Sequence, residues 1–325
     1  MIITPMKENF LYDEISPIVV ASGGIGNQLF QYCLALAIGK GTETVPYLDF
    51  TLLALSHKSG NQRPTIRSLP LAKVKIASRA SNFETFIANN SRRFSKTISR
   101  RYIHTLEQDA RNNSYKVFKQ SALIWDRSIH PEIRSLYIGS FTSFQYWKEH
   151  FHQFTQSIQG FLNSYSLELG LIDQAEGSEV VIHARRGDYS KNSKTRRLHG
   201  VYGLEYYISA LSKYYNRQYK TLAILSDDPR FAKSLAKELR AQFPSIYTTV
   251  PKVSNPLFLL QSYSNCQLFI GSNSTFSWWL ANLGVDKIRV LPLKWFDQGE
   301  YGFDSKAHFP LDTELLPFPF ETRQP

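Results

Sequence analysis

Residues 179–189 read EVVIHARRGDY and restrict the possible folds more strongly than any other stretch of this 325-residue sequence. A short β-branched run is followed at once by a histidine, two arginines, a glycine and an acid. This order is typical of a buried parallel strand whose carboxyl end opens onto a crevice. Because ligands of open α/β sheets bind at that edge, the stretch predicts an α/β protein with a ligand site directly after the strand.

Short apolar runs alternate with helical patterns along most of the chain. The sequence predicts strands at 17–21, 44–50, 135–139, 180–183, 221–225, 246–250, 266–270 and 288–291. Helices are expected at 27–38, 204–215, 229–239 and 257–262, with a further one beginning at Ser274. This order indicates doubly wound parallel sheets, and a polar segment at 160–178 predicts a domain boundary. Pro46 argues for an edge position or a bend in the second strand. Between about residues 51 and 135 no period persists, and only helical pieces are expected there.

The formal charge of +11 at pH 7 favours an anionic partner, which is nucleic acid, a membrane surface or a nucleotide-linked substrate. Against nucleic acid, the basic residues are not interleaved with aromatic residues as a stacking platform needs. Basic residues gather between Arg79 and Arg101. That segment is either a solvated helix face or a contact with an acidic bilayer.

The two cysteines, Cys33 and Cys266, lie in apolar stretches, which fits reduced buried thiols in a cytoplasmic protein. The first residues lack the basic head and apolar middle of a signal peptide. No run of about 18 apolar residues occurs. We therefore expect a cytoplasmic protein, with peripheral contact at the inner face of the membrane as a candidate property.

Arg185 and Arg186 suit anion capture, because each guanidinium matches a pair of phosphate oxygens. Adjacent residues of an extended strand point to opposite sides. One arginine is therefore expected to face the ligand and the other to brace the loop, with Asp188 as its candidate partner. The alternative is an arginine pair on a solvated loop.

The sequence GGIGNQ forms a glycine-rich turn between the first strand and the first helix. Gly24 and Gly26 begin a dinucleotide fingerprint, but Leu29 stands in place of its third glycine, and no Walker sequence occurs. Free N–H groups at the helix start suit an anion, and Asn27 and Gln28 add amide groups. A turn that serves only packing is the alternative.

Two further polar groups follow apolar strands in the second half. In LSDDPRF, Asp228 is expected to cap the helix that begins at Pro229, which leaves Asp227 freer to meet a ligand. In SNSTFSWW, hydroxyl and N–H groups gather at a helix start, where a phosphate would be stabilised most. Capping alone is the alternative. The sequence has no D-x-D triplet and no metal-ligand spacing of histidines and cysteines, so we expect neither a metal nor a cofactor.

Four motifs, GGIGNQLFQY, HARRGDY, LSDDPRF and SNSTFSWW, resemble those of the bacterial α-1,2-fucosyltransferases of glycosyltransferase family eleven. They run from Gly23 to Trp279 and so span most of the chain. The resemblance implies a GT-B architecture of two Rossmann-like domains facing a central cleft. Residues 1–165 would form the acceptor side and residues 166–325 would bind GDP-fucose. L-Fucose would pass from GDP-β-L-fucose to a galactose-containing acceptor, with inversion and without a metal. The reaction would take place during assembly of a bacterial surface polysaccharide, and a lipid-linked oligosaccharide is the candidate acceptor.

The resemblance also implies roles for single residues. Arg185 would bind the β-phosphate and stabilise the departing GDP, and His183 would help to hold the guanine. Ser274 and Thr275 would contact the diphosphate. The donor-binding set further includes Asp227 and Asn273, and the residues expected near the acceptor and the fucose are Gly24, Gly26, Asn27 and Gln28.

A general base must lie within hydrogen-bond reach of the attacking hydroxyl. Asp188 is the first candidate and Asp49 the second, with a bracing role as the alternative for Asp188. Fucosyltransferases of this kind usually carry an acid before the SNS motif that reads the guanine edge, but residues 251–284 contain none. Asn255 and Asp227 are the candidate substitutes.

Other functions are compatible with the same sequence. An enzyme of the same fold would differ in linkage, for example α-1,6 transfer, or would use another GDP-sugar. A nucleotide-binding or nucleic-acid-binding module is the non-enzyme alternative.

Overall fold

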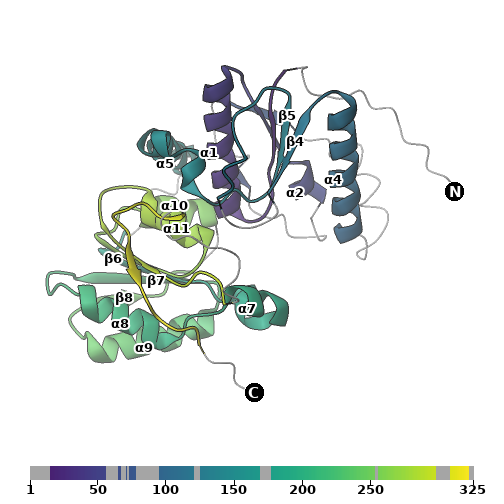
Figure 1. The fold of residues 1–325 in the computed structure, drawn as a ribbon. Coiled ribbons are helices and arrows are strands. Elements are labelled where there is room, and N and C mark those ends of the chain that lie inside the picture. Colours follow the sequence, from purple (N-terminus) through teal and green to yellow (C-terminus); the bar gives the residue numbers. More distant parts are fainter. Residues whose placement is uncertain are drawn as a thin grey trace. The chain divides into compact units, whose positions relative to one another are not determined.

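The computed structural model describes residues 15–55, 65–66, 71, 73–77, 95–120, 125–168, 177–252, 255–297 and 308–321. Its contacts divide the chain into two compact units. The first unit consists of residues 1–67 and 71–141, and the second of residues 68–70 and 142–325. Each unit contains one sheet with helices packed on it (Figure 1). Residues 78–94, which hold most of the basic segment Arg79–Arg101, lie outside the described residues.

The sheet of the first unit has five parallel strands in the order β3-β2-β1-β5-β4. These strands are β1 (Ile18–Val20), β2 (Tyr47–Asp49), β3 (Lys75–Ala77), β4 (Lys116–Lys119) and β5 (Ser135–Ile138). The helices are α1 (Ile25–Thr42), α2 (Thr51–Leu55) and α4 (Ser95–Asn112). Ile18 and Leu136 pack against Leu106 and Ala110 of α4. Helix α1 lies on the other side of the sheet from α4 (Figure 1).

Strand β2 lies inside this sheet, between β3 and β1, so the edge position suggested by Pro46 is wrong. The strand begins one residue after Pro46, whose carbonyl accepts a hydrogen bond from the Lys75 N–H at 2.8 Å. The missing N–H of proline therefore falls outside the ladder of β2. Strands β3 and β4 were not expected. Both are short edge strands with exposed lysines, which leave too few apolar positions for a period to show.

The sheet of the second unit has six parallel strands in the order β11-β10-β9-β6-β7-β8. These strands are β6 (Val180–Ala184), β7 (Thr221–Ser226), β8 (Tyr247–Thr249), β9 (Leu268–Gly271), β10 (Ile288–Pro292) and β11 (Glu314–Leu316). The helices are α5 (Phe151–Glu168), α6 (Gly187–Lys191), α7 (Ser193–His199), α8 (Leu204–Tyr214), α9 (Pro229–Gln242), α10 (Pro256–Tyr263) and α11 (Thr275–Asn282). All the strands and helices expected after residue 178 are confirmed, with ends that differ by a few residues. The two Rossmann-like units that the GT-B expectation requires are present.

Helix α5 packs with the second unit. Its buried residues include Phe154, Ile158 and Leu162, and it follows two short 3-10 turns at Phe144–Tyr146 and Lys148–His150. The contacts separate the two units after residue 141, whereas the sequence suggested residues 1–165 and 166–325. Position 165 lies inside this helix.

Candidate active site at the end of strand β6

The candidate site lies where the order of strands reverses in the second sheet. After β6 the chain adds β7 and β8 on one side, and it then adds β9, β10 and β11 on the other side. Strands β6 and β9 are parallel neighbours in which His183 pairs with Gly271. Open α/β sheets bind ligands at the carboxyl ends of such strands, so the residues that follow these two positions are the candidates.

Arg185 is the first residue after β6, and its side chain remains 34% exposed. Its backbone N–H donates to the Ser272 hydroxyl at 3.0 Å, which ties it to the loop after β9. The guanidinium donates to the carboxylates of Asp227 and Asp188. A cation is therefore fixed at the carboxyl end of β6 and remains partly exposed, so an anionic ligand can reach it.

Arg186 points the other way and is buried. Its guanidinium donates to the Tyr202 carbonyl at 2.8 Å and to the Glu321 carboxylate at 3.0 Å. It also lies 4.0 Å from the centre of the Phe231 ring. Arg186 is thus the bracing member of the pair. The expected partner was wrong, because Asp188 pairs with the neighbouring Arg185 and not with Arg186.

Asp227 and Asp228 follow β7, the neighbour of β6. Asp228 caps α9, as expected, since its side chain accepts hydrogen bonds from the N–H groups of Arg230 and Phe231. One oxygen of Asp227 accepts from the N–H groups of Arg186 at 2.7 Å and Gly187 at 2.9 Å, and the other pairs with the Arg185 guanidinium. Asp227 is therefore less free to meet a ligand than the sequence suggested.

His183 is the buried histidine of β6, with an exposed fraction of 7%. Its Nδ1 lies 2.6 Å from the Ser277 hydroxyl, which also accepts a hydrogen bond from the Ser272 N–H at 3.1 Å. Burial lowers the pKa of His183 to about 4, against the opposing effect of the Asp227 charge. The imidazole is therefore neutral near pH 7 and links β6 to α11. Its contact with guanine stays a prediction.

The loop after β9 places three polar side chains, each with its own contact. Ser272 accepts the Arg185 N–H, and Ser274 caps α11 by accepting the Phe276 N–H at 3.3 Å. Both amide hydrogens of Asn273 are used, by the carbonyls of His199 at 2.6 Å and Trp295 at 3.0 Å. The structure therefore gives Asn273 a bracing role in the loop.

Thr275 is the first residue of α11, so it lies where a helix offers unpaired N–H groups. Sequence reasoning gave no role to Ser277, Tyr189 or Glu321, although the first two lie inside the quoted motifs. Ser277 contacts His183 and Glu321 contacts Arg186, which are 94 and 135 residues away in the chain, so no local pattern could indicate these pairs.

In the first unit, the glycine-rich turn is held by two glutamines. Gln28, which is buried, donates to the Gly23 carbonyl at 3.1 Å and accepts from the Ile66 N–H at 3.0 Å. Gln31, which sequence reasoning missed, donates to the Gly139 carbonyl at 2.7 Å after β5. Gln28 therefore shapes the turn from inside and does not present its amide to a ligand.

Three other predicted residues belong to the same turn. Gly24 is the N-cap of α1, and a Cβ added there would meet nothing within 4 Å, so one side of the turn is open. Gly23 has a positive φ of 76°, a conformation that favours glycine. A Cβ on Gly23 would also lie 2.7 Å from Asn27 Nδ2, while Gly26 is buried in the first turn of the helix.

The two candidate bases differ in exposure. Asp49 is completely buried and accepts hydrogen bonds from the Thr51 N–H at 2.8 Å and from the Tyr102 hydroxyl. The Asp188 side chain is 55% exposed. Only Asp188 offers a carboxylate that an acceptor hydroxyl can approach.

The two suggested guanine readers are both occupied. The Asn255 side chain caps α10 by accepting the Leu257 N–H at 3.0 Å, and its Nδ2 donates to the Tyr165 hydroxyl at 3.3 Å. Asp227 is held as described above. The structure does not support either of them as a substitute for the missing acid.

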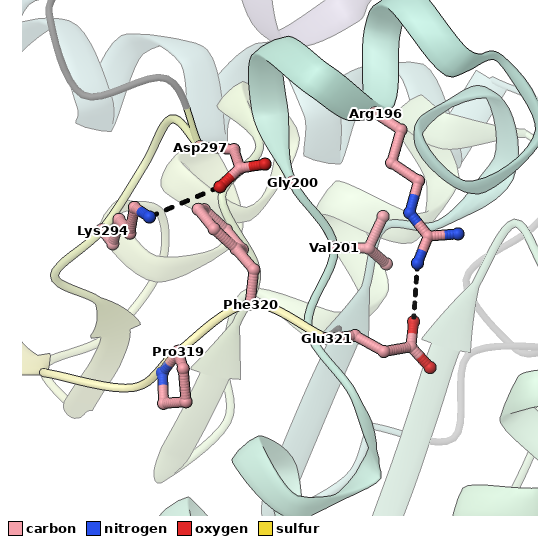
Figure 2. Close-up of a pocket in the computed structure, with 8 residues that line it drawn as sticks. All are labelled: Arg196, Gly200, Val201, Lys294, Asp297, Pro319, Phe320 and Glu321. Carbon is pink, nitrogen blue, oxygen red and sulfur yellow. Dashed lines mark hydrogen bonds and ion pairs between the residues drawn. The ribbon is translucent and has the colours of Figure 1, made fainter. Parts of the chain in front are cut away.

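A separate hollow of about 310 Å³ lies within the second unit. Figure 2 shows two ion pairs on its walls, Lys294 with Asp297 at 3.4 Å and Arg196 with Glu321 at 3.9 Å, with Phe320 between them. Glu321, which lines the hollow, also accepts a hydrogen bond from the bracing Arg186. The cations of the hollow are paired with acids of the same hollow.

Two further observations apply to the described ranges alone. Within them, no three histidine, cysteine or acidic residues come together in a group that could hold a metal ion. None of the described helices combines the length and the apolar character that crossing a bilayer requires.

Comparison with known proteins places this chain among glycosyltransferases. The model of the family described as "Glycosyl transferase family 11" matches residues 96–308, which is more than half of the chain. An α-1,2-colitosyltransferase from Escherichia coli is 25% identical over 87% of this chain and 94% of its own length. The O-antigen biosynthesis glycosyltransferase WbnK, also from Escherichia coli, is 23% identical over 85% of this chain and 93% of its own length.

Solved structures with a similar chain path include two fucosyltransferases. NodZ from Bradyrhizobium is 12% identical, with a TM-score of 0.41 and coverage of 84% of this chain and 94% of that one. POFUT1 in complex with GDP-fucose is 11% identical, with a TM-score of 0.41 and coverage of 85% and 97%. Likeness at these values does not extend to donor, linkage or acceptor.

Proposed function

This chain belongs to glycosyl transferase family 11, and from that membership we propose that it is an inverting α-1,2-fucosyltransferase. It transfers L-fucose from GDP-β-L-fucose to a galactose-containing acceptor. One observation carries the proposal: Arg185 is a partly exposed guanidinium, fixed by two carboxylates at the switch point of the second sheet. The α-1,2 linkage in the name of the 25% identical relative supports the regiochemistry.

The chemistry asks for a cation at the leaving group. As the bond between C1 of fucose and the β-phosphate oxygen breaks, its electron pair passes to the diphosphate, and the sugar becomes oxocarbenium-like. A preorganised guanidinium acts where that negative charge develops, and it therefore lowers the barrier. The N–H groups at the start of α11, beginning with Thr275, supply further positive potential beside it.

Asp188 is the proposed general base. Its carboxylate pairs with Arg185, the same guanidinium that the donor diphosphate needs. An arriving diphosphate competes with the carboxylate for those N–H groups, and the displaced Asp188 is then free to accept the proton of the acceptor hydroxyl. Attack from the face opposite the diphosphate inverts the configuration at C1.

Metal independence is part of the proposal, with Arg185 and the α11 start in place of a cation. Gly24, Gly26 and Asn27 are the proposed residues near fucose and acceptor. A surface-polysaccharide acceptor is supported by the O-antigen name of the second relative.

A cytoplasmic location and bilayer contact through Arg79–Arg101 are also proposed. Of the basic side chains in that segment, the structure describes Arg100 and Arg101, which are exposed on α4. Sedimentation with vesicles that contain an acidic lipid, compared with neutral vesicles, tests the contact.

A second candidate donor is GDP-colitose, because one relative is named a colitosyltransferase. Colitose is L-fucose that lacks one ring hydroxyl. A site that hydrogen-bonds this hydroxyl would reject colitose strongly, whereas a site that leaves it unbonded would accept both sugars.

The test is a donor screen with released nucleotide as the readout. GDP-fucose, GDP-colitose, GDP-mannose, UDP-galactose and no donor are compared with lactose or N-acetyllactosamine as acceptor, with and without EDTA. We expect GDP release from GDP-fucose, unchanged by EDTA, and a product with an α-1,2 linkage. Preference for another donor would contradict GDP-fucose as the donor, and an α-1,6 product would contradict the proposed linkage. Loss of activity in EDTA would contradict metal independence. GDP binding without turnover on any donor would favour a binding module.

A further inference from the structure

Binding of a donor diphosphate would change the contacts that hold the Arg185 guanidinium. Two carboxylates hold the guanidinium, and one of them, Asp188, has a side chain that is 55% exposed. A diphosphate that binds the guanidinium removes part of this support. Something else must then fix the side chain at the moment when its charge acts on the leaving group.

Tyr189 supplies a contact that a diphosphate does not remove. The Cζ atom of Arg185 lies 5.2 Å from the centre of the Tyr189 ring. Cations within about 6 Å of an aromatic centroid are attracted by the negative face of the ring. The Arg185 guanidinium lies over the Tyr189 ring, whereas diphosphate oxygens bind its N–H groups, so the two kinds of contact are compatible.

The ring of Tyr189 is itself held from behind. It stacks on His199 with the centroids 4.4 Å apart and an angle of 10° between the planes. His199 in turn lies 5.4 Å from the Phe296 ring, and its carbonyl accepts a hydrogen bond from Asn273 at 2.6 Å. The stack is therefore anchored in the loop after β9, the second element of the site.

Both stacked rings are uncharged near pH 7. Burial lowers the pKa of His199 to about 4, and burial raises the pKa of Tyr189 to about 12. His199 therefore adds no positive charge behind the tyrosine ring that would oppose its attraction for Arg185. The chain thus presents a guanidinium, a neutral phenol ring and a neutral imidazole in succession.

We propose that Tyr189, backed by His199, is a positioning residue that holds the Arg185 guanidinium in place for the donor diphosphate. This inference rests on the proposed function. The same stack gives Asn273 a defined task, because this residue fixes the carbonyl of His199 rather than the donor itself.

The first test replaces the ring in the full-length chain. We expect Tyr189→Leu to lower kcat about 10-fold with GDP-fucose, which corresponds to about 1.4 kcal/mol. The donor KM should change much less, because the charge on the diphosphate is greatest in the transition state. Tyr189→Phe, which keeps the ring and loses only the hydroxyl, should restore most of kcat.

The control is Tyr214→Leu. Tyr214 has Lys213 Nζ at 5.1 Å from its ring centre and is likewise half-buried, so the same change removes an equivalent contact under a different cation. This variant should keep wild-type kcat. A Tyr189→Leu enzyme with unchanged kcat, or a Tyr189→Phe enzyme as slow as Tyr189→Leu, would overturn the role of the ring.

A double-mutant cycle distinguishes positioning of Arg185 from a general effect on folding. If Tyr189 acts through the guanidinium, Tyr189→Leu should cost less than about 2-fold in kcat in an Arg185→Lys background. An equal loss in both backgrounds would overturn the proposal.

The same cycle measured as GDP affinity by calorimetry does not depend on the sugar or the acceptor. Non-additive GDP binding together with failure to use GDP-fucose would retain the positioning role and reject the proposed donor. Additive GDP binding in an active fucosyltransferase would retain the proposed donor and reject the positioning role of Tyr189.

Discussion

Arg185 and Arg186 show how two identical, adjacent side chains take different tasks. The Arg185 side chain is 34% exposed and pairs with two carboxylates at the carboxyl end of β6. Arg186 is buried between the Tyr202 carbonyl, Glu321 and the Phe231 ring. A buried charge is tolerated only when it is paired and hydrogen-bonded, and Arg186 satisfies this condition with groups from three separate segments.

The environment of Arg186 leads to a stability prediction. We expect Arg186→Met to lower the free energy of unfolding by roughly 2–3 kcal/mol, since it removes the nearer of the two arginines that pair with Glu321 and two further buried contacts. Urea denaturation of the full chain measures the change. Lys233→Met is the control, because Lys233 is an exposed cation on α9 of the same unit, and it should change stability little. Equal stability of both variants would contradict the bracing role.

Three histidines of the second unit lead to a pH prediction: His183 and His308 are buried, and His199 is half-buried. Burial lowers the pKa of His183 and His199 from 6.5 to about 4, and that of His308 from 6.5 to about 3. At a pH between the pKa of a histidine in the unfolded chain and its lower pKa in the folded chain, the unfolded chain binds a proton that the folded chain does not. Above pH 6.5 these histidines therefore do not lower the free energy of unfolding. As the pH drops from 6.5 toward 4, the free energy of unfolding falls by at most about 1.4 kcal/mol per pH unit for each histidine.

Urea midpoints at pH 7.5, 6 and 5 check this dependence. A His308→Phe variant separates the histidine contribution from that of the carboxylates. His308 lies 4.9 Å from the Trp295 ring, so an aromatic replacement keeps the packing. The slope below pH 6.5 should be shallower in this variant, and an identical slope would show that burial of His308 does not contribute.

At the scale of elements, periodicity predicted the buried strands well. Strand β6 has five buried residues, and its apolar run left no other interpretation. Helix α9 was equally clear, because a capping acid, a proline and an amphipathic pattern coincide at Asp228–Pro229. Strands β3 and β4 could not be predicted, since short edge strands bury too few side chains to produce alternation. The last part of helix α5 fell inside the polar segment at 160–178 that was interpreted as a boundary, although the buried face of this helix belongs to the second unit.

The turn between β6 and α6 leads to a prediction about glycine. A Cβ on Gly187 would lie 2.3 Å from Asp227 Oδ2, so Gly187→Ala should displace the carboxylate that holds both the turn and Arg185. We expect kcat/KM to fall by about 10-fold or more, because displacing a group of the site by about 1 Å can cost that much. Kinetics with GDP-fucose and the thermal midpoint measure the two effects separately.

The matched control is Gly160→Ala. Gly160 lies within α5, and a Cβ there would meet nothing within 4 Å. Alanine is the better helix former, so this change should keep activity and raise stability by about 0.5–1 kcal/mol. A Gly187→Ala enzyme as active as Gly160→Ala would mean that Asp227 can move without consequence.

At the scale of the whole molecule, the four motifs were sufficient to predict two Rossmann-like units and the family. They were less informative about which side chain does what. Asn273 and Asp227 were expected to contact the donor, but their hydrogen bonds hold the protein itself. A motif marks where polar groups gather, whereas the division between binding and bracing depends on partners such as Glu321 that are more than a hundred residues away.

The charge of the molecule supports the same interpretation at long range. A chain of net charge +11 attracts an anionic donor, but the attraction does not select one nucleotide sugar from another. Selection and catalysis must come from the site, and the central claim is that the Arg185 guanidinium carries the charge of the outgoing GDP.

The most direct measurement compares Arg185→Ala with the wild-type chain in kcat for GDP release from GDP-fucose and in thermal midpoint. Arg217→Ala, at an exposed arginine of the same unit, is the control and should behave as wild type. We predict a loss of about 100-fold or more in kcat for Arg185→Ala. The midpoint should shift by no more than about 4 °C. Full turnover in the Arg185→Ala enzyme, or turnover in the wild type that disappears on chelation of metal ions, would contradict the claim.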